Sequence, residues 1–220
     1  MADTQRSAWI FANGDLPDPE RLRARLRLGD AFFAADGGQH HLARLGLRPE
    51  RVIGDLDSLN AAEVRQLEAD GVALERYPVD KDETDLELAL NRAIQEGYAI
   101  IRIVGALGGR LDQTLGNLFL LQRSDLAGLD VRLEDGSEEV FLIRERCEVA
   151  GAPGDTLSLL PLGGAAHGVT TVGLKYPLKG ETLYPEKTRG ISNVMLAESA
   201  AVSLEGGVLV CVHRREGPHA

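Results

Sequence analysis

Residues 85–104, DLELALNRAIQEGYAIIRIV, place a helix-forming segment directly before a strand-forming one. Apolar side chains recur at positions 86, 89, 90, 93 and 94, which share one face of an α-helix, while polar and charged side chains fill the other faces. Gly97 follows, as expected of a residue that ends a helix, and the apolar run 100–104 is typical of a buried strand. The stretch therefore predicts an amphipathic helix that packs on a sheet.

The same alternation extends back to the start of the chain. Four further β-rich apolar runs, at 8–12, 31–35, 51–53 and 72–77, are separated by segments with helical spacing. Strands that alternate with helices through short loops form right-handed βαβ crossovers and a mainly parallel sheet. We therefore expect residues 1–128 to form an α/β domain, with a Rossmann-like sheet flanked by helices.

Beyond residue 128 the sequence predicts strands without helices between them. Glycines, prolines and turn pairs separate the apolar runs. These runs are 131–133, 140–143, 156–160, 168–172, 200–204 and 208–213. The Glu-Gly-Gly segment at 205–207 predicts a tight hairpin between the last two runs. We expect an all-β sandwich domain in residues 129–220.

The charge of the chain limits its partners. Among 220 residues, 34 acidic side chains outnumber 24 basic ones, which gives a formal net charge of −10. This balance disfavours nucleic acids and anionic membrane surfaces as partners. A polyphosphate ligand would then require local bases, or metal ions between the two sets of anions. Two isolated cysteines, with no export signal and no long apolar span, predict a cytoplasmic protein without a membrane segment.

Many of the acidic residues gather at one edge of the expected sheet. Each of the second to fifth strands is followed by at least one aspartate. These aspartates are Asp36, Asp55, Asp57, Asp80, Asp82, Asp85 and Asp112. In an open parallel sheet, ligands bind beyond the carboxyl ends of the strands. Any one aspartate could simply cap a turn or a helix, but the joint pattern indicates a binding site.

The aspartates favour a magnesium site. Crowded carboxylates repel one another unless cations hold them, and oxygen ligands on loops suit Mg²⁺ better than zinc. Asp55 and Asp57 are two residues apart and could face one ion, and Asp85 could supply a third oxygen. Asp36, Asp82 and Asp112 would then position the substrate or support the ion's ligands.

Bases that could bind phosphate occur in the same loops. Lys81 lies among the aspartates of 80–85, and Arg110 follows the small residues GALGG at 105–109. These glycines fit neither the P-loop nor the dinucleotide-binding pattern. Arg110 could equally pair with Asp112, so on its own this loop is a weak signal.

Taken together, the loops resemble those of the thiamine pyrophosphokinase family. Six segments match the family in order and spacing over nearly the whole chain. They are ADGG at 35–38, GDLDS at 54–58, DKDETDLE at 80–87, GALGGRLD at 105–112 with Asn117, GLKYPL at 173–178 and RGISN at 189–193. The resemblance implies an ATP-binding α/β domain followed by a thiamine-binding β-sandwich. It also implies a homodimer with active sites between the N-terminal domain of one subunit and the C-terminal domain of the other.

The resemblance assigns residues to three roles. The ligands of Mg²⁺ would be Asp55, Asp57 and Asp85. The ATP and transfer region would be lined by Asp36, Gly37, Lys81, Asp82, Thr84, Gly105, Gly108, Arg110, Asp112 and Asn117. The thiamine side would comprise Lys175, Tyr176, Ser192, Asn193 and Met195. Two positions depart from the family pattern, because Gln113 stands where many bacterial members have histidine and Met195 stands where an aromatic is usual.

The implied reaction is ATP plus thiamine to AMP plus thiamine diphosphate. The thiamine hydroxyl would attack the β-phosphorus, AMP would leave, and charge would be balanced by magnesium on Asp55, Asp57 and Asp85 together with the cations Arg110 and Lys81. Asp82 or Asp112 could accept the hydroxyl proton, and the residues alone leave that choice open. Two alternatives remain: a diphosphokinase for another hydroxymethyl heterocycle such as a pterin, or a non-catalytic sensor of nucleotide or thiamine. The complete set of carboxylates argues against a sensor.

Overall fold

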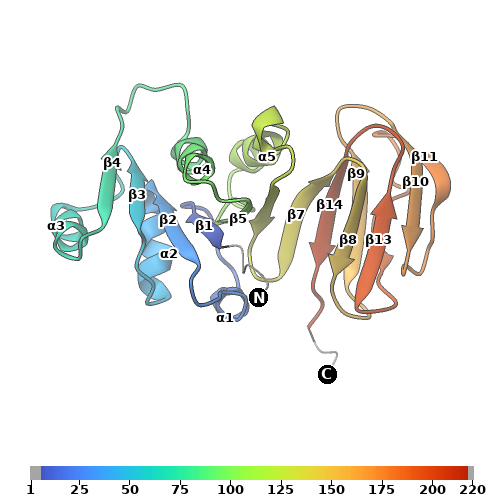
Figure 1. Cartoon of the computed structure of the whole chain (residues 1–220), viewed down its shortest axis with the longest axis horizontal. Coiled ribbons are helices and arrows are strands. Elements are labelled where there is room, and N and C mark those ends of the chain that lie inside the picture. Colours follow the sequence, from blue (N-terminus) through green and yellow to red (C-terminus); the bar gives the residue numbers. More distant parts are fainter. Residues whose placement is uncertain (1–5, 218–220) are drawn as a thin grey trace. The chain divides into compact units, whose positions relative to one another are not determined.

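The computed structural model describes residues 6–217, which form two compact units that divide between Gly136 and Ser137 (Figure 1). The first unit holds a sheet with the strand order β6-β5-β1-β2-β3-β4, and every adjacent pair is parallel. Its strands are β1 (Ser7–Phe11), β2 (Ala31–Ala35), β3 (Arg51–Gly54), β4 (Ala73–Arg76), β5 (Ile100–Val104) and β6 (Asp130–Glu134). Its helices are α1 (Pro19–Arg23), α2 (Gln39–Arg44), α3 (Ala61–Ala69), α4 (Asp85–Gln95) and α5 (Leu111–Leu120).

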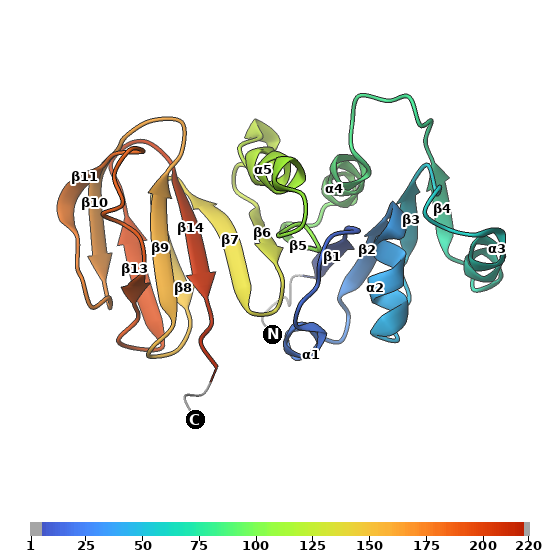
Figure 2. The ribbon, with the colours of Figure 1, turned by 180° about the vertical axis from the view of Figure 1, so that it is seen from behind.

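Helices cover both faces of this sheet. Because side chains alternate along a strand, Trp9 and Phe11 of β1 share one face, where they belong to an apolar cluster with Leu42 of α2 and Leu67 of α3. The opposite face carries the apolar stripe of α4, which contacts β1, β2 and β3. The two views show α2 and α4 on opposite sides of the sheet (Figures 1 and 2). The expected α/β fold with a flanked parallel sheet is confirmed.

The amphipathic helix is found where the sequence predicts it. Thr84 caps α4, because its Oγ1 accepts a hydrogen bond from the Glu87 N–H at 3.2 Å. The apolar positions of α4 are buried, and Gly97, with φ +82°, follows the helix in the left-handed conformation that glycine tolerates. This capped start places Asp85 at the carboxyl edge of the sheet, in the first turn of the helix.

The second unit is a sandwich of two antiparallel sheets. Their strand orders are β12-β9-β14-β7 and β11-β10-β13-β8. The strands are β7 (Glu138–Ile143), β8 (Arg146–Ala150), β9 (Thr156–Pro161), β10 (Ala166–Val172), β11 (Lys179–Leu183), β12 (Asn193–Val194), β13 (Ser199–Ser203) and β14 (Leu209–Arg214). One apolar cluster, which includes Val149, Leu157, Val169 and Val202, fills the space between the sheets. The expected all-β sandwich is confirmed.

Two details of the sequence interpretation were wrong. The run 131–133 was expected in the β-sandwich, but it lies in β6, which pairs in parallel with β5 of the first unit, so the expected boundary at 128/129 precedes that strand. The segment 205–207 is not a hairpin, because it connects β13 in one sheet to β14 in the other. Its backbone instead exchanges hydrogen bonds with His167. Among residues 6–217, no helix has the length and apolar character needed to cross a membrane.

Candidate active site

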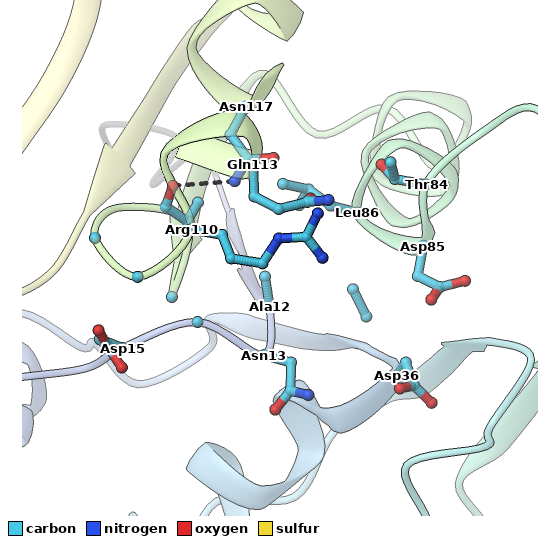
Figure 3. Close-up of a pocket in the computed structure, with 16 residues that line it drawn as sticks. Ala12, Asn13, Asp15, Asp36, Thr84, Asp85, Leu86, Arg110, Gln113 and Asn117 are labelled. Atoms are coloured by element: carbon cyan, nitrogen blue, oxygen red, sulfur yellow. Dashed lines mark hydrogen bonds between the residues drawn. The ribbon is translucent and has the colours of Figure 1, made fainter. Parts of the chain in front are cut away.

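A cavity of about 430 Å³ lies at the carboxyl ends of β1, β2 and β5 (Figure 3). The loops after these strands and the first turns of α4 and α5 line it, as the rule for open parallel sheets predicts. Of the residues singled out from the sequence, those that line the cavity are Asp36, Thr84, Asp85, Gly105, Gly108, Arg110 and Asn117. Part of the predicted ATP side therefore lines one cavity.

Glycine makes the floor of the cavity possible. Gly105 has φ +68°, and a Cβ atom there would lie 2.4 Å from the carbonyl oxygen of Ala12, so no other residue fits without a backbone shift. The neighbouring Gly14 carbonyl accepts a hydrogen bond from His41 Nε2 at 2.7 Å. On the other side, Asn117 Nδ2 donates to the Ala106 carbonyl at 3.0 Å. These contacts tie the loop after β1 to α2 and the loop after β5 to α5, and the Gly14 N–H joins the two loops by donating to the Gly105 carbonyl at 2.9 Å.

Three carboxylates form a candidate metal centre next to this floor. One oxygen each of Asp36, Asp55 and Asp57 lies within 4.8 Å of the other two. Asp36 is 7% exposed, and its Oδ1 is buried without a hydrogen-bond partner among the described residues. A buried carboxylate oxygen without a donor is costly unless a cation binds it. The arrangement thus fits a divalent metal ion, which prefers such oxygen ligands.

Asp85 has a different partner from the one expected. Its Oδ1 lies 2.9 Å from Lys81 Nζ, one turn earlier in the chain, and the same ammonium is 4.0 Å from Asp55 Oδ2. Burial raises the pKa of Asp85 even though Lys81 opposes the change. The hydrogen bond to Asp85 raises the pKa of Lys81, so the ammonium stays charged at neutral pH. Asp85 thus stands beside the group of three carboxylates, paired with lysine.

Arg110 and Asp112 form an ion pair at the entrance of α5. Two guanidinium nitrogens lie 2.6 and 3.1 Å from the carboxylate oxygens, although both side chains are mostly exposed. The hydrogen bond from Arg110 lowers the pKa of Asp112, and the same bond raises the pKa of Arg110. In Figure 3, Arg110 extends into the middle of the cavity, with Asp36 and Asp85 on one side and Asp15 on the other. Both readings of Arg110 therefore hold, since it pairs with Asp112 and lines the cavity.

Six of the residues predicted for the metal and ATP side lie outside the lining of the cavity, and three residues that line it were missed. The six are Gly37, Asp55, Asp57, Lys81, Asp82 and Asp112. Asp82 is exposed and does not line the cavity. Gly37 is buried, and a Cβ atom there would lie 2.5 Å from the Asn13 side chain, so the two residues pack closely. The missed residues Asn13, Gly14 and Asp15 follow β1. The rule that located the other loops applies equally to the first strand, so the sequence did carry their signal.

The predicted thiamine residues lie in the second unit, where backbone contacts hold them in place. The side-chain amide of Asn193 accepts from the Tyr176 N–H at 2.9 Å and donates to the Tyr176 carbonyl at 2.7 Å. Lys175 Nζ stands 5.5 Å from the centre of the exposed Tyr176 ring. Ser192 is exposed with φ +57°, and its N–H donates to the Ser158 hydroxyl at 3.0 Å.

Met195 does not match its expected role. Its side chain is 1% exposed and belongs to the apolar cluster of the sandwich, so it offers no surface on which a substrate ring could pack. The expectation came from the family resemblance, in which an aromatic residue is usual at this position. The pairing of β12 with β9 instead directs the chain inward at this point.

Comparisons with known proteins agree with this two-part arrangement. Residues 26–133 match the model "Thiamin pyrophosphokinase, catalytic domain", and residues 143–209 match "Thiamin pyrophosphokinase, vitamin B1 binding domain". A thiamine pyrophosphokinase of Bacillus subtilis (strain 168) is 30% identical over 191 residues, which cover 82% of this chain and 86% of the relative.

Solved structures give the same result. The crystal structure of thiamine pyrophosphokinase from Bacillus subtilis has a TM-score of 0.86 at 27% identity, over 96% of this chain and 100% of that one. The enzyme from Geobacillus thermodenitrificans has a TM-score of 0.83 at 27% identity, over 96% and 99%. Yeast thiamin pyrophosphokinase, at 19% identity, a TM-score of 0.76 and coverage of 96% and 87%, shares the fold. The chain belongs to the thiamin pyrophosphokinase family.

Proposed function

We propose that this chain transfers the β,γ-diphosphoryl group of ATP to the hydroxyl of thiamine, giving thiamine diphosphate and AMP. The observation that carries the proposal is the group of Asp36, Asp55 and Asp57 beside Lys81, at the edge of a glycine-floored cavity. Such a site can balance the charge of a polyphosphate in an otherwise acidic protein. The family relationship supports the reaction, since the matching relatives are named for it.

The residues fit a bound Mg²⁺, although they extend the set expected from the sequence. Asp55 and Asp57 would hold the ion, with Asp36 as a third ligand and Asp85 within reach once Lys81 moves to phosphate. The unpaired Asp36 oxygen supports this assignment. When bound, the ion would neutralise phosphate oxygens and hold them in line for transfer.

Other side chains would bind and orient the nucleotide. Lys81 and Arg110 offer charged donors to phosphate oxygens, and Gly105 and Gly108 let the backbone approach the ligand closely. The first N–H groups of α5 add partial positive charge at the same place. Most of the catalytic effect would then come from positioning and charge balance rather than from covalent chemistry.

The proton of the thiamine hydroxyl needs an acceptor. The hydrogen bond from Arg110 lowers the pKa of Asp112, so the ion pair makes this carboxylate a weaker base than an unpaired aspartate. That direction favours Asp82, which has no ion-pair partner among the described residues and lies on the loop before α4.

We also propose a homodimer whose active sites combine residues of two subunits. Helix α5 carries Leu111, Leu115 and Phe119 at intervals of four residues, and their exposed fractions are 71%, 41% and 51%. In the second unit, Tyr176 and Leu196 are 52% and 59% exposed. Exposed apolar residues grouped in this way are typical of surfaces that another protein covers. A cytoplasmic location stays a prediction.

The decisive experiment identifies both products. Purified protein is incubated with Mg-ATP and thiamine, and the nucleotides and thiamine esters are separated by chromatography. Thiamine-dependent formation of AMP together with thiamine diphosphate is expected. ADP or free phosphate as the nucleotide product would refute diphosphoryl transfer, and binding of ATP without turnover would support a sensor. A parallel reaction with a hydroxymethylpterin tests the alternative that the chain is a diphosphokinase for a pterin. Faster turnover of the pterin would identify it, rather than thiamine, as the preferred substrate.

A further inference from the structure

A buried network of charged groups underlies the predicted thiamine side. His213 of β14 is 0% exposed, and each ring nitrogen faces a carboxylate. Its Nδ1 lies 2.9 Å from Glu139 Oε1, and its Nε2 lies 3.0 Å from Asp155 Oδ2. Glu139 and Asp155 are themselves only 2% and 3% exposed. Arg215 also contacts this group, with a guanidinium nitrogen 2.9 Å from the second Glu139 oxygen.

The geometry assigns a protonation state to His213. A neutral imidazole donates from one ring nitrogen only, so the other nitrogen would face a carboxylate oxygen with no proton between them. A ring that donates from both nitrogens satisfies both carboxylates. With His213 as an imidazolium, the buried carboxylates Glu139 and Asp155 each face a positive ring nitrogen, as buried charges require. We therefore assign protons to both nitrogens.

Asp155 connects this network to the backbone of the next segment. Its Oδ2, besides facing His213, accepts from the Ala152 N–H at 2.9 Å and so closes the turn before β9. The Asp155 carbonyl accepts from the Met195 N–H at 2.8 Å, and the Gly154 N–H donates to the Met195 carbonyl at 2.9 Å. The turn thus holds both backbone groups of Met195. The fit is tight, since a Cβ atom on Gly151 would lie 2.8–2.9 Å from atoms of Asp155, His213 and Met195.

From Met195 the contacts continue to the exposed residues of the predicted substrate side. Val194 accepts a backbone hydrogen bond from Lys175 at 2.9 Å. Asn193 holds Tyr176 through both atoms of its amide. A continuous set of hydrogen bonds therefore runs from the buried imidazolium, through the turn and β12, to the segment that presents Lys175 and Tyr176.

We propose that His213 is a positioning residue for the thiamine-binding segment. Its imidazolium fixes Asp155, the Asp155 turn fixes residues 193–195, and these fix the backbone of Lys175 and Tyr176. The inference rests on the proposed function, because it assumes that this segment binds thiamine. Binding to a segment held in place in advance avoids the entropy cost of ordering it. Loss of the imidazolium should therefore weaken the binding of thiamine and leave the binding of ATP, which uses the first unit, unchanged.

The test compares His213→Gln with His167→Gln, a matched change at an exposed histidine of the same unit. Initial rates are measured with thiamine varied at saturating Mg-ATP, and then with ATP varied. His213→Gln is expected to raise the KM for thiamine by about tenfold and to leave the KM for ATP within about twofold, because only ground-state binding of thiamine is lost. His167→Gln should leave both values unchanged. A folded His213→Gln protein with an unchanged KM for thiamine would overturn the proposal, as would an equal rise in both KM values.

Two further measurements keep the proposal testable if His213→Gln does not fold. Asp155→Asn nearly keeps the volume of the side chain but removes the charge that faces His213 and one of the two acceptors that backbone N–H groups use, so it should raise the KM for thiamine in the same direction. NMR of the wild-type ring nitrogens at neutral pH should show protons on both, and a single proton would overturn the assignment. Failure of the wild type to form thiamine diphosphate would instead refute the proposed function, so the two failures are distinguishable.

Discussion

Replacement of Asp36 by asparagine should stabilise the metal-free protein and weaken the metal-bound one. Two unit charges 4.8 Å apart repel by about 0.9 kcal/mol in water and by about 3.5 kcal/mol at an effective dielectric constant of 20. Asp36→Asn removes two such repulsions, with Asp55 and Asp57. Because Asp57 is exposed, the aqueous value applies more closely, and we expect a gain of about 2 kcal/mol without metal. Asparagine also tolerates the φ of +43° at this position, so no strain is added.

Magnesium should reverse this order. An ion at 100 times its Kd stabilises the wild type by about 2.7 kcal/mol, and the variant should lose most of that gain. Trp9, the single tryptophan, is 4% exposed in the first unit, so its fluorescence in a urea titration reports the unfolding of that unit. Titrations are run in a chelator and in saturating Mg²⁺. Formation of thiamine diphosphate should fall about 100-fold or more in the variant.

The control is Glu68→Gln, which removes an exposed carboxylate from α3. It should change neither the stability nor the activity by a measurable amount, since exposed substitutions rarely do. The reasoning is refuted if Asp36→Asn is less stable than the wild type in the chelator, or if Mg²⁺ stabilises both proteins equally. In either case Asp36 would not belong to the group of crowded carboxylates that binds the ion.

Three other changes test the fold and the assembly. Asp130 is partly buried, which would raise its pKa, but Arg102 and Arg132 outweigh burial and lower the pKa. The stabilisation by the Asp130 carboxylate is therefore present at neutral pH and is lost as the pH falls through the pKa of Asp130 in the folded protein. Asp130→Asn should cost about 1 kcal/mol at pH 7 and flatten the acid limb of a plot of stability against pH, and an unchanged limb would contradict this. Gly105→Ala should lower the free energy of unfolding by at least about 1–2 kcal/mol from the positive φ alone, and should also raise the KM for ATP. A urea titration checks the stability and initial rates check the KM. Wild-type values of both would show that the ligand does not need a close approach to the backbone at Gly105. Leu115→Glu should give monomers in sedimentation experiments and should change the stability of the first unit by about 0.5 kcal/mol or less. A stable dimer of this variant would show that the exposed apolar residues of α5 do not form the interface.

The parts of the fold that follow from local patterns could be predicted from the sequence. Helix α4 has a cap, an apolar stripe and a terminal glycine, so each end is marked by a residue with a physical reason to be there. The pairing of β6 could not be predicted in this way, because an apolar run does not tell whether its partner is parallel or antiparallel. Strand β11 was missed because KGETL has almost no apolar residues, and β12 because it is only two residues long. Both lie at sheet edges, where packing demands little of a sequence.

In the candidate site, too, some features could be predicted from the sequence and others could not. The aspartates that follow strands were located correctly, because the position of a residue at the end of a strand depends only on the strand. Their grouping depends on side-chain direction, which the sequence does not contain. Asp36 turns toward Asp55 through a positive φ, and Asp85 pairs with Lys81 one helical turn away. The burial of Met195 likewise depends on β12 pairing with β9, a contact between residues far apart in the chain.

At the carboxylate site, the ammonium of Lys81 already occupies positions that a metal ion would take. The ammonium pairs with Asp85 and approaches Asp55, so it would compete with a divalent ion for the same oxygens. A triphosphate would give that ammonium another partner and would thereby release the carboxylates to the ion. Since coupling between two ligands is reciprocal, the nucleotide and the ion must then increase each other's affinity by the same factor. A lysine one turn before Asp85 would thus couple the two proposed binding events into cooperative loading of a single charge-balanced complex.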